Sequence, residues 1–164
     1  MTRPAPVLVL AVGNPSRGDD ALGPALAERL EALALPGVEV LVDFQLQVEH
    51  SLDLVGREVV VFVDAGAQTP APYQLLEAQS AEELAHTSHA LAPGAVLAAY
   101  RRVHGSEPPR ALVLCVRGES FELGEPLSAA AAAHLDSAWA ALQDLCVLAD
   151  QQQRGAQPPT RPPR

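Results

Sequence analysis

Short apolar runs alternate with longer segments of helical periodicity along the chain. Residues 7–12 (VLVLAV) and 59–63 (VVVFV) are nearly continuous apolar runs, as expected of strands buried on both faces. Between residues 20 and 35, leucines recur at helical spacing, and Pro36-Gly37 closes that segment. This order predicts an α/β fold: a three-layer α/β/α sandwich with a mostly parallel twisted sheet of about five strands.

The remaining elements continue the alternation. We expect strands at 38–42 and 111–116, an edge strand at 73–78, and helices ending at Gly56 and spanning 87–103 and 127–149. Ser128 is placed to cap the last of these helices. We interpret residues 1–150 as a single domain. Residues 151–164, rich in Gln, Pro and Arg, are expected to form a disordered tail because they offer no apolar face.

Composition narrows the classes of partner. The chain has 164 residues, of which 48% are hydrophobic, and this suffices for one buried core; a monomer is the simplest expectation. The net charge of −9 disfavours nucleic-acid binding, because no basic field is available to displace counterions from phosphates. We see neither a signal peptide nor a membrane span, and therefore expect a cytoplasmic protein. Cys115 and Cys146 lie in apolar segments and are expected to be buried, reduced thiols.

The turn 13-GNPSRGDD-20 follows the first predicted strand and precedes a helix. Its glycines have the spacing of a phosphate-binding loop, but Asp19-Asp20 replaces the lysine and hydroxyl that such a loop needs. Two carboxylates would repel a triphosphate. One of them, Asp19, is expected to cap the helix, and the surplus carboxylate of Asp20 points to a cation.

Three acidic segments leave the carboxyl ends of predicted strands: the turn with Asp20, the stretch beginning at Asp43, and Asp64. In parallel sheets, these ends open onto the same edge, where ligand sites gather. His89 supplies an imidazole near the start of a helix, with His86 as its competitor. Asp20, Asp64 and His89 would form an open site for a borderline divalent ion, with positions left for outside ligands.

No hydrolytic triad or nucleophile elbow is visible, and neither cysteine lies in an electropositive setting suited to a thiolate nucleophile. Glu49-His50 is a local acid–base candidate. A pair of this kind on a short helix is more often solvated surface, so the roles of Asp43, Glu49 and His50 stay open.

Four stretches together resemble the maturation peptidases of nickel–iron hydrogenases, over most of residues 7–149. They are 9-VLAVGNPSRGDDALGPALAERL-30, 59-VVVFVDAG-66, 87-TSHALAPGAVL-97 and 112-LVLCVRGESFELGEPLS-128. The segment 45-QLQVEH-50 is similar to the branch that serves NAD-reducing, bidirectional hydrogenases.

The resemblance implies an endopeptidase that removes a short C-terminal extension from the precursor of a hydrogenase large subunit after nickel insertion, cutting after a His or Arg. Its metal-contacting residues fall on Asp20, Asp64 and His89. These residues would hold the nickel carried by the substrate, so no permanently bound cofactor is expected. Two hard carboxylates and an imidazole could share this ion without stripping it from soft thiolates. As a Lewis acid, it would polarise the scissile carbonyl or a bound water.

Two alternatives remain. A metallochaperone that binds the large subunit without cutting it would need the same metal-facing residues. A peptidyl-tRNA hydrolase would share the Gly13-Asn14-Pro15 turn, but the acidic composition and the absence of a histidine soon after the turn disfavour this enzyme.

Overall fold

The computed structural model describes residues 3–80 and 91–155. Five strands form one sheet in the order β2-β1-β3-β5-β4. They are β1 Val7–Val12, β2 Val38–Asp43, β3 Val59–Gly66, β4 Tyr73–Glu77 and β5 Arg110–Arg117. The first three and β5 are parallel, whereas β4 pairs antiparallel with β5 at one edge. The predicted mostly parallel sheet and its edge strand are confirmed.

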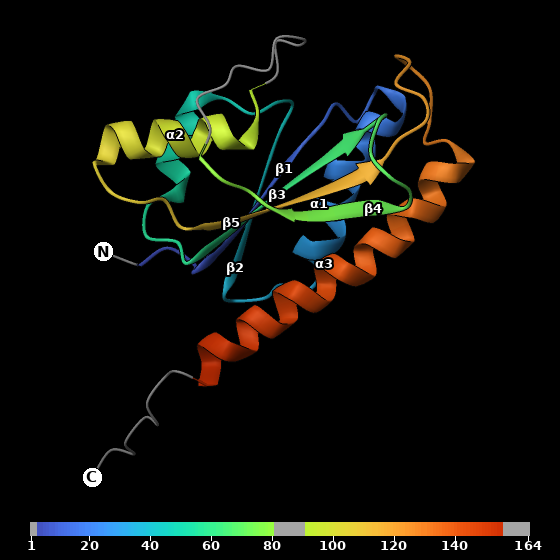
Figure 1. The fold of residues 1–164 in the computed structure, drawn as a ribbon. Coiled ribbons are helices and arrows are strands. Elements are labelled where there is room, and N and C mark those ends of the chain that lie inside the picture. Colours follow the sequence, from blue (N-terminus) through green and yellow to red (C-terminus); the bar gives the residue numbers. More distant parts are fainter. Residues whose placement is uncertain (1–2, 81–90, 156–164) are drawn as a thin grey trace.

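Helices cover both faces of this sheet (Figure 1). They are η1 Gly18–Ala21, α1 Leu22–Ala32, η2 Val48–Leu54, α2 Pro93–His104 and α3 Ala129–Gly155. The core residues of α1 and α3 pack with one face of the strands, and those of α2 and the η2 region pack with the other. The predicted α/β/α sandwich is confirmed.

The strands alternate between two apolar cores. On β1, Val7, Val9 and Ala11 face α1 and α3, whereas Leu8, Leu10 and Val12 face α2 and η2. On β3, Val60 and Phe62 also face α2 and η2. Because side chains alternate along a strand, Asp64 at the carboxyl end of β3 points to this same side.

The predicted helix 20–35 is two elements in the structure. A 3-10 turn, η1, carries the two aspartates, and α1 begins only at Leu22. Gly23 lies against β1 so closely that a Cβ would stand 2.4 Å from the carbonyl oxygen of Val12. The 3-10 turn therefore lets the chain leave β1 and come back onto it before the α-helix starts.

The last helix is longer than the sequence suggests. Ser128 caps it as predicted, because its Oγ accepts a hydrogen bond from the N–H of Ala131 at 3.1 Å. Its other end lies at Gly155, so the expectation that disorder starts at residue 151 is wrong for residues 151–155. Asp150 explains the extension, since its Oδ1 accepts a hydrogen bond from the N–H of Gly37 at 2.8 Å and ties the helix to the base of the sheet. Residues 156–164 lie outside the described part.

The predicted helix 87–103 corresponds to α2, which starts at Pro93 in the described part of the chain. Proline fits this first position because its missing N–H would have no partner there. Among the described helices, none combines the length and the apolar character needed to span a bilayer.

Candidate functional site

The strand order reverses at β1, and open α/β sheets form a crevice at the carboxyl edge next to such a reversal. From β1 the chain passes to β2 on one side, and β3 then pairs with the opposite side of β1. Ligands in parallel α/β sheets bind at such a reversal of strand order. The turn after β1 and the end of β3 flank this point, and they carry Asp20 and Asp64.

Asp20 is held over the crevice by its own turn. Its Oδ2 accepts a hydrogen bond from the N–H of Asn14 at 2.7 Å. The turn folds back tightly at Gly13, where φ is +149° and a Cβ would lie 2.0 Å from the carbonyl oxygen of Asp20. Only glycine fits there, so the Gly13-Asn14 pair fixes where the carboxylate of Asp20 stands.

Asp64 belongs to β3, which runs three residues past its predicted end and pairs Asp64 with Cys115 of β5. Its Oδ1 accepts a hydrogen bond from the N–H of Ala65 at 2.7 Å. The pKa of Asp64 is raised to about 6, chiefly by burial; the Ala65 hydrogen bond acts against this shift, and the negative charge of Asp20 adds to it. The structure therefore brings Asp20 and Asp64 within electrostatic reach of each other, as the crevice rule predicts. A cation between them would relieve the repulsion.

The third predicted ligand, His89, lies outside the described residues, as does His86. Within residues 3–80 and 91–155, no group of three His, Cys, Asp or Glu side chains is arranged to hold a metal ion. The described part thus contributes two carboxylates to the predicted site. The assignment of Asp20, Asp64 and His89 as metal contacts stays a prediction.

Asp19 does not cap a helix, contrary to the expectation from sequence. No side chain caps η1 or α1. Instead, the fully buried carboxylate of Asp19 accepts hydrogen bonds from the loop between β5 and α3, residues 118–128. Its donors are the N–H groups of Glu119 at 2.7 Å, Ser120 at 3.0 Å and Ser128 at 2.7 Å, and the hydroxyl of Ser128 at 2.8 Å. Burial opposes ionisation, but these hydrogen bonds outweigh it and lower the pKa of Asp19.

Backbone hydrogen bonds extend this junction between the turn and the 118–128 loop. The N–H of Gly18 donates to the carbonyl of Glu125 at 3.0 Å, and that of Gly124 donates to Ser16 at 2.7 Å. Arg17 Nε donates to the carbonyl of Phe121 at 3.0 Å. The loop therefore forms a fixed wall beside Asp20.

Cys115 lies beside Asp64 in the sheet, and its Sγ is 2.9 Å from Oγ1 of Thr69. Burial raises the pKa of the Cys115 thiol, with the charge of Asp64 acting in the same direction. Burial also raises the pKa of Cys146 to about 12. Both cysteines are free thiols; Cys146 is buried as predicted, whereas Cys115 is only half-buried. Raised pKa values argue against a thiolate nucleophile at either position.

A contact that sequence reasoning missed joins Asp43 to His50. His50 Nε2 lies 3.2 Å from Oδ2 of Asp43. His50 is buried, whereas Glu49 next to it is exposed, so the surface interpretation of this pair holds for Glu49 alone. A loop separates the two residues, so their spacing in the sequence does not predict the contact. The one hint of a functional role was the position of Asp43 at the end of a strand.

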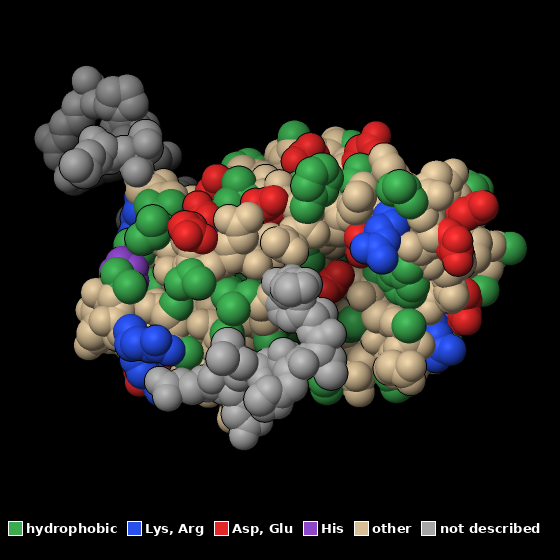
Figure 2. Space-filling view, turned by 90° about the horizontal axis from the view of Figure 1, so that it is seen from above, with side chains coloured by type: hydrophobic (Ala, Val, Ile, Leu, Met, Phe, Trp, Pro, Cys, Tyr) green, Lys and Arg blue, Asp and Glu red, His purple; other side chains and the backbone are tan. Residues whose placement is uncertain are grey.

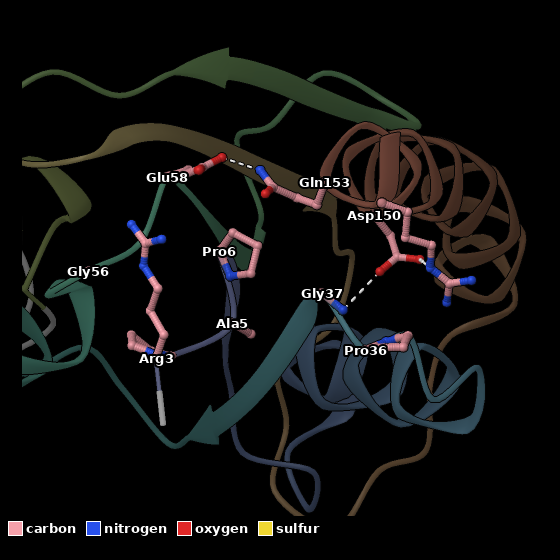
Figure 3. Close-up of a pocket in the computed structure, with 11 residues that line it drawn as sticks. Arg3, Ala5, Pro6, Pro36, Gly37, Gly56, Glu58, Asp150 and Gln153 are labelled. Carbon is pink, nitrogen blue, oxygen red and sulfur yellow. Dashed lines mark hydrogen bonds and ion pairs between the residues drawn. The ribbon is translucent and has the colours of Figure 1, made fainter. Parts of the chain in front are cut away.

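A hollow of about 580 Å³ lies at the opposite edge of the sheet, beside the amino ends of the strands (Figure 3). Arg3, Pro6, Glu58 and Gln153 are among its lining residues. Glu58 and Gln153 are hydrogen-bonded to each other across it. The hollow is separated from Asp20 and Asp64 by the length of the strands, so its size does not mark it as the site suggested by the carboxylates.

The surface agrees with the acidic composition. In the view of Figure 2, acidic and hydrophobic side chains lie next to one another over the visible face. Two large apolar side chains are exposed near the carboxyl edge: Phe44, directly after β2, is 69% exposed, and Leu123, in the 118–128 loop, is 75% exposed. Exposed side chains of this size next to a site suit contact with another protein.

Comparisons with solved structures place the fold in one class. The chain is similar to the hydrogenase maturating endopeptidase HybD from E. coli, with 27% identity over 84% of this chain and 92% of that chain, and a TM-score of 0.61. It is also similar to an endopeptidase from Escherichia coli solved in solution, with 28% identity over 91% of this chain and 93% of that chain, and a TM-score of 0.66.

A third similar structure is a [NiFe] hydrogenase maturation protease, HycI from Thermococcus kodakarensis, with 22% identity over 90% of this chain, 91% of that chain and a TM-score of 0.63. At that identity, the likeness shows the fold alone. No family model matches the sequence, and no curated protein does. The predicted fold and the predicted class, a hydrolase of peptide bonds, are confirmed by these neighbours.

Replacing Asp19 tests whether it holds the turn and the loop together. Asp19→Ala removes the acceptor of three partly buried backbone N–H groups, and should lower the free energy of unfolding by roughly 3–5 kcal/mol. Ser128→Ala removes one hydroxyl donor and the helix cap, and should cost about 1–2 kcal/mol. Urea unfolding of both variants and the wild type measures the difference. Equal stability of Asp19→Ala and the wild type would contradict the role of Asp19.

The same carboxylate sets a dependence on pH. Because the pKa of Asp19 is lower in the folded than in the unfolded protein, its contribution to stability is fully present above the ordinary value of 3.8. The contribution is lost as the pH falls through the lower, folded value. The stability difference between wild type and Asp19→Asn should therefore shrink on acidification below about pH 4, as urea unfolding at several pH values would show. A difference that grows there would contradict the account.

Asp64→Asn should stabilise the metal-free protein at neutral pH. From 3.8 to about 6, the unfolded chain ionises at Asp64 before the folded chain does, so stability falls as the pH rises. Above about 6, the full penalty is present, at most about 3 kcal/mol. Thermal unfolding in a chelator should show a higher Tm for the variant at about pH 8, and a smaller difference at about pH 4. A lower Tm of the variant at the higher pH would contradict this.

Proposed function

We propose that this chain is an endopeptidase that removes the C-terminal extension from the nickel-loaded precursor of a nickel–iron hydrogenase large subunit. One observation carries the proposal: two carboxylates, Asp20 and Asp64, lie at the strand-order reversal of a fold whose similar structures include a hydrogenase maturating endopeptidase and a second endopeptidase. The narrower assignment, to peptidases of NAD-reducing hydrogenases, rests on the resemblance of residues 45–50 alone.

Nickel enters this proposal as part of the substrate. Burial, with the negative charge of Asp20 as a smaller cause, raises the pKa of Asp64 to about 6, so its ionised form is disfavoured, and an arriving cation would reduce that penalty. His89 would add an imidazole. Carboxylate and imidazole donors can share nickel with cysteine thiolates of the substrate without displacing them, so binding would report that insertion is complete. As a Lewis acid next to the scissile bond, the ion would polarise the carbonyl or a water.

We expect this chain to act as a monomer in the cytoplasm, and two features of its surface support a protein partner. The rim of the crevice exposes Phe44 and Leu123, and the net charge of −9 favours a partner with a basic face. The same acidity disfavours tRNA as a substrate. A non-cutting metallochaperone would use the same carboxylates; the names of the similar structures favour the peptidase.

The direct test compares cleavage of nickel-loaded and nickel-free precursor, followed by the mass of the large subunit. The wild type should shorten only the nickel-loaded form. Asp20→Asn and Asp64→Asn should each lower kcat/KM by on the order of 100-fold, because each removes a charged contact to the ion. His89→Ala should do the same.

Asp144→Asn is the matched control, since it removes an exposed carboxylate on α3 away from the crevice. It should cleave at the wild-type rate. Equal cleavage of both precursor forms, or full activity of Asp20→Asn, would contradict nickel recognition. Tight binding of the precursor with no change in its mass would identify a metallochaperone instead.

A further inference from the structure

Strand β2 ends in a third carboxylate, whose surroundings differ from those of Asp20 and Asp64. Asp43 is the last residue of β2, and its side chain is 41% exposed. One oxygen, Oδ1, accepts a hydrogen bond from the N–H of Phe44 at 2.7 Å, and the other lies 3.2 Å from His50 Nε2. Both oxygens are therefore fixed in place while the carboxylate stays open to an incoming group.

The ring of His50 is anchored on both sides. Its Nδ1 accepts a hydrogen bond from the N–H of Gln47 at 2.8 Å, as part of the capping box that starts η2. An accepting Nδ1 carries no proton, so the proton of the neutral ring lies on Nε2, the nitrogen that is 3.2 Å from Oδ2 of Asp43. The imidazole side chain is only 11% exposed. Nδ1 accepts the Gln47 hydrogen bond and Nε2 faces Asp43, so His50 has no free lone pair to act as a base. Any influence of His50 on a bound substrate is therefore indirect, through the position of Asp43.

The sheet register relates Asp43 to the two carboxylates of the crevice. Val12 of β1 pairs with Asp43, and the adjacent pair on β1 and β3 is Ala11 with Val63, so Asp64 falls in the same row. Val12 packs in the core under α2 and η2, which places the side chains of Asp43 and Asp64 on that same face of the sheet.

Asp43 is two strands away from Asp64, a separation of about 10 Å. A general base must reach its proton within about 3 Å, so Asp43 is too far to serve an ion held between Asp20 and Asp64. A distance of this size spans about three residues of an extended peptide. The carboxylate is therefore placed to contact the substrate chain next to the scissile bond, rather than the reacting atoms.

We propose that Asp43 binds an N–H donor of the substrate segment next to the scissile bond, and that His50 is the positioning residue that holds Asp43 for this contact. The inference rests on the proposed function, since it concerns the same substrate. The competing view is that His50 serves only to cap η2. The two ring nitrogens separate these roles, because Nδ1 accepts the capping hydrogen bond and Nε2 contacts Asp43.

Two substitutions of His50 test the roles of its two ring nitrogens separately. In His50→Asn, the amide oxygen can replace Nδ1 as acceptor for Gln47, but the side chain is too short to reach Asp43. In His50→Gln, the amide N–H can replace Nε2 as donor to Asp43, while the acceptor for Gln47 is lost. The exposed neighbour variant Glu49→Gln is the matched control. Steady-state cleavage of nickel-loaded precursor and urea unfolding are measured for each.

The positioning role predicts that His50→Asn keeps its stability but raises KM roughly tenfold with little change in kcat, since binding of the substrate chain is impaired. His50→Gln should be less stable, yet recover most of the wild-type KM. Asp43→Asn should raise KM to a similar extent. Adding His50→Asn to Asp43→Asn should cause no further rise, because His50 acts through Asp43.

Several outcomes would overturn the inference. Wild-type KM for His50→Asn, with activity lost only in the destabilised His50→Gln, would show that His50 is a cap alone. Additive effects of His50→Asn and Asp43→Asn would show that they act independently. A fall in kcat at unchanged KM would place Asp43 in the chemistry. If the wild type leaves nickel-loaded precursor uncut, the proposed function fails and this inference falls with it; silent variants of an active wild type overturn the inference only.

Discussion

The buried carboxylate of Asp19 is the interaction on which the rest of the candidate site depends. It joins the turn after β1 to the loop before α3 through donors at Glu119, Ser120 and Ser128. A buried charge is tolerated only when it is fully hydrogen-bonded, and four donors meet that condition here. Asp20 is the next residue, so the hydrogen bonds of Asp19 also hold the backbone of Asp20 in place beside the crevice. Of the two adjacent aspartates, Asp19 thus stabilises the structure, and Asp20 is the candidate site residue.

The burial of Asp64 near Asp20 costs stability when both carboxylates are ionised, and a purely structural role would not require this cost. Asp64 is buried close to another carboxylate, and its pKa rises to about 6 as a result. Functional sites commonly hold groups in states that cost stability, and the cost is recovered when the ligand binds. Substrate binding would then relieve the repulsion at the moment when the metal has to be recognised.

Much of the fold could be predicted because its strands are continuous apolar runs. β1 matches its expected range, and the turn with Asp20 and the end of β3 with Asp64 lie at the same edge of the sheet, as predicted. The misses concern contacts between distant parts of the chain. Asp19 pairs with Glu119, 100 positions away, and Asp150 pairs with Gly37, 113 positions away. Local spacing contains no information on such pairs, so Asp19 looked like a helix cap and the end of α3 looked disordered. His50 and Asp43 were likewise separated by a loop of unpredictable path.

The account's central claim is that Asp20 and Asp64 contact the nickel carried by the substrate. X-ray absorption at the nickel edge measures this directly, on the precursor alone and in its complex with a slowly cleaving His89→Ala variant. The account predicts additional oxygen ligands in the complex, which disappear when Asp20→Asn and Asp64→Asn are introduced together. An identical nickel ligand shell in the free and the bound precursor would contradict it.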